Sequence, residues 1–168
     1  MQRRTWLALA VTAPLSGCSE AEVKTFATLD AADRGLVELL KYPHRTTGAW
    51  KLGQVLDHLT QSIEYSLTGY PQKESALFRA TAGAAAFTFF DIRGSMSHAL
   101  NQPIPGAPAL KDAEIGSAVA RLRDALGRFA AQKRELQAHF AYGDLTHAQY
   151  TRAHLMHLAN HWSEVVRA

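Results

Sequence analysis

Apolar residues recur every three or four positions over most of the chain, the spacing of a helix that buries one face. Residues 29–40 follow this pattern and predict a first helix that Pro43 ends. A second helix is predicted from Trp50 to Thr68, because Gly69 and the proline that follows two residues later stop the pattern. Both segments therefore predict helices with one buried face.

The middle of the chain is less regular. Residues 75–90 are rich in alanine and phenylalanine and predict a further helix, although Gly83 disfavours one. Residues 94–111 hold Pro103, Pro105 and Pro108, which exclude regular structure there. Loops of that length are uncommon inside a compact domain and are often functional.

Two more helices are predicted in the C-terminal half. One spans residues 112–142, with Asp112 as N-cap and Gly143 at its end. Thr146 and Gln149 form a capping box for the last helix, which is expected to continue to the chain end. Since no segment alternates like a strand, the predicted fold is all-α, a four-helix bundle with one long crossover loop.

The 168 residues suit one domain, predicted at 29–168, behind an N-terminal segment of different character. Arg3 and Arg4 precede an apolar stretch at 6–15, as in a secretory signal. The Leu-Ser-Gly-Cys sequence that ends at Cys18 resembles the signal of bacterial lipoproteins, in which the cysteine carries a lipid. This implies a signal peptide at 1–17, a lipidated tether at 18–28 and a periplasmic protein anchored to the membrane.

The export route stays open. Arg3-Arg4-Thr5-Trp6-Leu7 resembles a twin-arginine signal, with Trp6 where that pattern more often has phenylalanine. A general secretory route and a cytosolic protein with a basic apolar N-terminal helix are the alternatives.

Charge and cysteine content limit the possible chemistry. Removal of Arg3 and Arg4, with no acidic residue, lowers the formal net charge from +3 to +1. No cluster of lysine and arginine remains, so nucleic acid is not an expected partner. Because lipidation would consume the single cysteine, Cys18, a metal site must use histidines and carboxylates.

Three histidines, His154, His157 and His161, share one face of the last predicted helix, within an arc of roughly 60°. Any two of them could bind one ion, and His58 lies on the second predicted helix. Imidazole is a common ligand of zinc, nickel and iron. The alternative is that each histidine is a core residue with its own hydrogen bonds.

The spacing of His157 and His161 is that of zinc proteases, which carry glutamate directly after the first histidine. Leu158 stands there instead, so the sequence does not predict a protease. Glu164 either acts as a general base or as a hydrogen-bond partner of a metal ligand, or it faces solvent.

A polar stripe surrounds His58. Gln54, Gln61 and Tyr65 share its helix face and predict a wet pocket. Asp57 either orients an imidazole or faces solvent.

Four other histidines fall outside these helix faces. His98 is expected to reach the pocket from the irregular loop, and His139 to close the third long helix through a positive charge. His44 and His147 are expected at the surface.

Segments 52–59, 103–108, 139–143 and 154–161 together resemble the DinB/YfiT-like metalloenzymes, and within them a DinB-like family of unknown function. The resemblance covers residues 29–166. It implies a four-helix bundle in which His58, His157 and His161 hold one divalent metal, with zinc, nickel or iron as candidates. His154 then either contacts these ligands without binding the metal, or is a core residue.

The resemblance implies a metal-dependent hydrolase or thiol transferase that activates water or a thiol toward a small-molecule substrate. An exported lipoprotein would rarely meet the cytoplasmic thiols that some relatives use. A metal-binding or ligand-binding protein without catalysis and a purely structural helical bundle are the alternatives, and a homodimer stays open.

Overall fold

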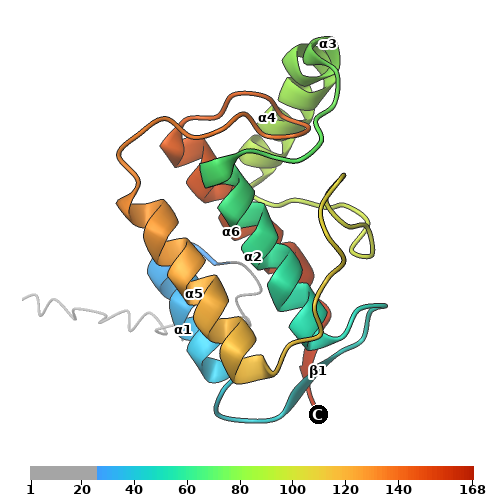
Figure 1. Ribbon diagram of the computed structural model, residues 1–168, viewed down its shortest axis with the longest axis vertical. Coiled ribbons are helices and arrows are strands. Elements are labelled where there is room, and N and C mark those ends of the chain that lie inside the picture. The colour runs from blue at the N-terminus through green and yellow to red at the C-terminus, as the bar shows by residue number, and fades with distance from the viewer. Residues whose placement is uncertain (1–25) are drawn as a thin grey trace, which may run out of the picture.

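A computed structural model describes residues 26–168 (Figure 1). The predicted signal peptide, Cys18 and most of the tether lie outside these residues. The described chain is mostly helical, which confirms the all-α class. Its elements are α1 (Leu29–Glu38), β1 (His44–Thr46), α2 (Leu52–Thr68), α3 (Ala76–Phe78), the π-helical turn η1 (Arg79–Gly83), α4 (Ala84–Arg93), α5 (Ile115–Ala131), α6 (His147–Trp162) and β2 (Val165–Arg167). Within residues 26–168, no helix has the length and apolar character needed to cross a membrane.

Helices α1, α2, α5 and α6 contribute to one hydrophobic core. Burial of each large side chain in it stabilises the fold by about 1.5–3 kcal/mol. The largest enclosed apolar side chains are Leu36, Leu56, Leu59, Ile63, Leu122, Phe129, Tyr150 and Leu158.

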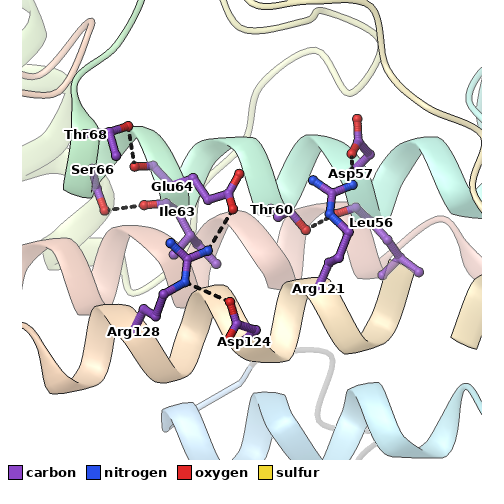
Figure 2. A network of polar contacts seen from close by, with 10 residues as sticks. All are labelled: Leu56, Asp57, Thr60, Ile63, Glu64, Ser66, Thr68, Arg121, Asp124 and Arg128. Atoms are coloured by element: carbon purple, nitrogen blue, oxygen red, sulfur yellow. Dashed lines mark hydrogen bonds and ion pairs between the residues drawn. The ribbon is translucent and has the colours of Figure 1, made fainter. Parts of the chain in front are cut away.

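Ion pairs between α2 and α5 show that these helices run parallel. Arg121 Nη1 lies 2.7 Å from Asp57 Oδ1, and Arg128 Nη2 lies 2.7 Å from Glu64 Oε1, so both helices advance together (Figure 2). Parallel neighbours need a connection that returns along the helix length. Residues 69–114, which include α3, η1 and α4, form this connection.

Asp57 is placed differently from both sequence-based expectations. Its carboxylate is buried and accepts hydrogen bonds from Arg121, from the Lys111 backbone N–H at 3.0 Å and from the Gln61 amide at 3.2 Å. It therefore neither orients an imidazole nor faces solvent. It ties α2 to α5 and to the end of the irregular loop, and the next residue, His58, points toward α6.

Helix α5 is shorter than the predicted helix at 112–142. Its N-cap is Glu114, whose carboxylate accepts from the backbone of Gly116 and Ser117, and it ends at Ala131. Beyond it the chain turns to α2, where the Gln137 N–H donates to the Ser66 carbonyl at 2.8 Å. This tertiary hydrogen bond replaces the continued helix.

The prediction that the last helix continues to the chain end, with no strand, is wrong. Helix α6 ends at Trp162, and Val165–Arg167 pairs antiparallel with His44–Thr46. The β-branched Val165 and Val166 favour a strand. Three-residue strands are too short to show alternation in sequence.

Helical residues 76–93 confirm the helix predicted near 75–90. Gly83 ends the π-helical turn within it, where an added Cβ would overlap the Ala141 carbonyl oxygen. Glycine at this position therefore lets the 139–143 turn pack directly against the helix. That turn carries His139, which is buried.

Candidate metal centre

Four histidines converge on one point of the fold. His58 comes from α2, His157 and His161 from α6, and His98 from the irregular segment between α4 and α5. One ring nitrogen from each lies within 4.8 Å of those of the other three. The structure thus brings the three sequence-predicted ligands together and adds His98.

The spacing of the first two histidines matches a metal site. His58 Nε2 and His157 Nε2 lie 3.2 Å apart. Two nitrogens bound tetrahedrally to one ion, at the usual zinc distance, would lie about 3.3 Å apart. Little movement is therefore needed for both to bind the same cation.

His161 has the least favourable surroundings for a free imidazole. Its side chain is fully buried, and neither ring nitrogen has a hydrogen-bond partner among the described residues. An unsatisfied buried polar group costs about 1–3 kcal/mol. A cation on one of these nitrogens would remove the penalty for that atom, so the donor set fits a divalent metal.

Trp50, which lies between β1 and α2, packs against the cluster. The Trp50 indole lies 5.0 Å from the His58 ring and stacks on the His161 ring at 6.1 Å and 8°. Trp50 therefore limits the rotation of two predicted ligands.

His98 reaches the cluster from a loop, as its sequence position indicated. The Asn160 side-chain amide lies 2.7 Å from His98 Nδ1, which leaves Nε2 to face the cluster. For His98 to bind a metal through Nε2, its proton must lie on Nδ1, and the Asn160 amide must then present its oxygen to that N–H. Because His98 is exposed, it is the member best placed to leave or join the site.

Burial keeps the cluster uncharged at neutral pH. It lowers the pKa of His58 to about 4 and the pKa of His161 to about 3, and it holds the pKa of His157 well below its usual range. Neutral imidazole is the form that binds metals. The folded protein thus presents these ligands ready for a cation.

Lowered histidine pKa values, in the cluster and at two other buried histidines, predict that acid destabilises the metal-free protein. Burial lowers the pKa of His139 and of His154 to about 3, whereas the unfolded chain binds protons near pH 6.5. Stability is then complete above pH 6.5 and falls as the pH drops toward these folded-state values, at about 1.4 kcal/mol per pH unit for each such histidine. Since His58, His157 and His161 add to the effect of His139 and His154, we expect urea unfolding to show a loss above roughly 3 kcal/mol between pH 7.5 and 5.5. Equal stability at both values would contradict the buried neutral state.

A cavity of about 300 Å³ adjoins the cluster. His58, His98 and His157 line one part of it, and the 139–143 turn lines another. The size suits a small-molecule ligand.

The polar stripe predicted around His58 has other roles. The Gln54 side chain accepts from the Lys51 N–H at the start of α2, Gln61 binds Asp57, and Tyr65 packs against Tyr70 with ring centroids 5.7 Å apart. None of the three lines the cavity.

Two further candidates, His154 and Glu164, are not members of the four-histidine group. His154 is buried, lines the cavity and contacts Ser66, outside the four-histidine group. The Glu164 carboxylate lies against Gly48, away from the cavity lining. Glu164 is thus not positioned to act on a ligand in the cavity.

The remaining histidines differ in exposure. His147 is exposed, as expected, and stacks on Phe129, whereas His44 lies half-buried in β1. His139 does not close a helix through positive charge, because α5 ends earlier and burial keeps the ring neutral.

Comparison with known families gives a match over residues 19–168 to proteins of unknown function designated DUF1569. The chain belongs to this family. No curated protein and no solved structure matches the chain. The histidine cluster of this DUF1569 protein is compatible with metal binding.

Proposed function

We propose that this DUF1569 protein binds one divalent metal through His58, His157 and His161, within a DinB-like four-helix bundle formed by α1, α2, α5 and α6. The observation that carries the proposal is His161, which is buried beside two other imidazoles and has no partner for either ring nitrogen within residues 26–168. Zinc, nickel and iron suit an imidazole donor set.

We further propose that the centre is catalytic. A bound divalent cation supplies Lewis acidity, which lowers the pKa of water or of a thiol. The chain contributes three ligands, a cavity of about 300 Å³ beside them and an exposed His98 that can leave space for a substrate. The export signal expected from the sequence favours water over a cytoplasmic thiol, which makes a metal-dependent hydrolase the first candidate and a thiol transferase the next.

Turnover by the metal-loaded protein tests this proposal. We expect hydrolysis of ester, amide or lactone substrates, or thiol addition to an electrophile, to require stoichiometric metal and to disappear in His157→Ala. His44→Ala, outside the cluster, is the matched control and should keep full activity. Stoichiometric metal binding with no turnover across both reaction screens would exclude the catalytic role.

His98 also supports a second candidate. Four histidines would complete a tetrahedral site, and closed sites of this kind are usually structural. The protein would then bind metal or ligand without catalysis. In that case His98→Ala should weaken metal binding about as much as His58→Ala, whereas a catalytic site would lose much less through His98→Ala.

A further inference from the structure

The end of the cavity formed by the 139–143 turn carries a hydrogen-bond donor for which the described residues offer no acceptor. His139 Nδ1 accepts from the Ala141 and Tyr142 backbone N–H groups, both at 3.1 Å. A neutral imidazole has one protonated nitrogen, so the proton lies on Nε2. Nε2 has no partner among the described residues, and it is not one of the enclosed atoms. Since His139 lines the cavity, this N–H is a free donor there.

His154 supplies a hydrogen-bond acceptor to the same cavity. Its Nε2 lies 3.2 Å from Ser66 Oγ, while Ser66 Oγ donates to the Ile63 carbonyl at 2.6 Å (Figure 2 shows the latter bond). Because the serine proton is used on Ile63, the His154 Nε2–H donates to Ser66. His154 Nδ1 is then an acceptor, and the described residues donate no hydrogen bond to it; the His154 side chain also lines the cavity.

Aromatic packing fixes the donor in place. The His139 ring stacks on Tyr142, with centroids 4.3 Å apart and an angle of 7°, and it meets the Tyr70 ring edge-on at 5.0 Å. The turn itself is closed by the His139 N–H, which donates to the Gly143 carbonyl at 2.8 Å. A ligand therefore meets a preorganised donor, which lowers the entropy cost of binding.

The walls of the cavity have almost no charge. Glu74, which is exposed, is the one carboxylate among the described lining residues, and no lysine or arginine is among them. His139 and His154 are neutral, since burial lowers the pKa of each to about 3. Met96, Ile104 and Phe140 add apolar surface. An anionic group at this end would lose its hydration without gaining a counter-charge.

We propose that the cavity binds an uncharged small molecule with a carbonyl-type oxygen that accepts from His139 Nε2 and an N–H or O–H group that donates to His154 Nδ1. A primary or secondary amide has both groups. This names the substrate class of the proposed centre and rests on the proposed function, because the ligand would lie beside the histidine cluster.

Binding of three size-matched probes to the metal-free protein tests the inference. By titration followed with amide NMR shifts, we expect benzamide to bind at least about tenfold more tightly than benzoate or benzylamine. Benzoate binding as tight as that of benzamide, or no benzamide binding at about 10 mM, would overturn it. Because no metal is present, failure of metal binding does not affect this result.

The variant His139→Asn removes the proposed donor but keeps the hydrogen bonds that form the turn. In His139→Asn the side-chain oxygen can still accept from the 141 and 142 N–H groups, but the ring nitrogen that faces the cavity is gone. We expect benzamide affinity to fall at least about tenfold, with no loss in His44→Asn. Unchanged affinity in His139→Asn refutes the role of His139.

Nitrogen NMR of the wild-type imidazoles gives a second test that needs no variant. The inference requires the Nε2–H form of His139 and a shift of that resonance when benzamide is added. The Nδ1–H form, or a resonance that benzamide leaves unmoved, would contradict it.

Discussion

Adding zinc or nickel to the metal-free protein is expected to raise its free energy of unfolding by about 4 kcal/mol at a free metal concentration a thousand times the dissociation constant. The folded state holds three neutral imidazoles from two helices close together, whereas the unfolded chain does not. Urea unfolding with and without metal measures the difference. Magnesium, which prefers oxygen ligands, should have no effect.

A histidine outside the cluster provides the control for this effect. His44 Nδ1 lies 2.7 Å from the Tyr42 carbonyl oxygen, and the residue belongs to β1. His44→Ala should therefore keep the full stabilisation by metal. A chelator that leaves the unfolding transition of the metal-loaded wild-type protein unchanged would favour the purely structural role of the histidines.

The substitution His161→Leu is expected to act in opposite directions with and without metal. Leucine has a similar volume and needs no hydrogen bond, so it removes the penalty of two ring nitrogens that find no partner in the described part of the chain. The metal-free variant should be more stable than the metal-free wild type by about 1–3 kcal/mol. It should also lose the stabilisation by metal, because one of three ligands is missing. Urea unfolding under both conditions measures both effects.

His139→Leu is the matched comparison. It makes the same exchange at a buried histidine, but His139 Nδ1 accepts two backbone N–H groups that would lose their partner. Its metal-free form should therefore be less stable than wild type. If His161→Leu destabilises the metal-free protein to the same extent, the His161 nitrogens do not carry the free-energy penalty that the metal proposal assumes.

Much of the fold could be predicted from helical periodicity. Apolar residues such as Leu56, Leu59 and Ile63 follow the spacing of a buried face, and they form part of the core. The capping box of Thr146 and Gln149 marked the start of α6, where the structure has it. The prolines at 103–108 marked the irregular segment between α4 and α5, whereas the parallel direction of α2 and α5 comes from ion pairs in the structure and was not predicted.

The errors arose where tertiary contacts decide the structure. Residues 132–142 have apolar residues at helical spacing, but their backbone bonds to the end of α2. The strand at 165–167 depends on a partner far away in sequence, at 44–46. Local patterns carry no information about either contact.

The candidate site could be predicted in part. Helical spacing placed His157 and His161 on one face, and the family resemblance added His58. Spacing gives no position for His98, because it lies in an irregular segment; the length of that loop was the one signal. The sequence left two roles open for Asp57, orienting an imidazole or facing solvent, and its position on α2 instead directs it to Arg121 on α5.

Elemental analysis of natively purified protein tests the central claim most directly. The proposal predicts about one equivalent of zinc, nickel or iron per chain, lost in His157→Ala and retained in His44→Ala. A folded wild-type protein that holds no metal after native purification, and takes up none when these ions are supplied, would contradict it.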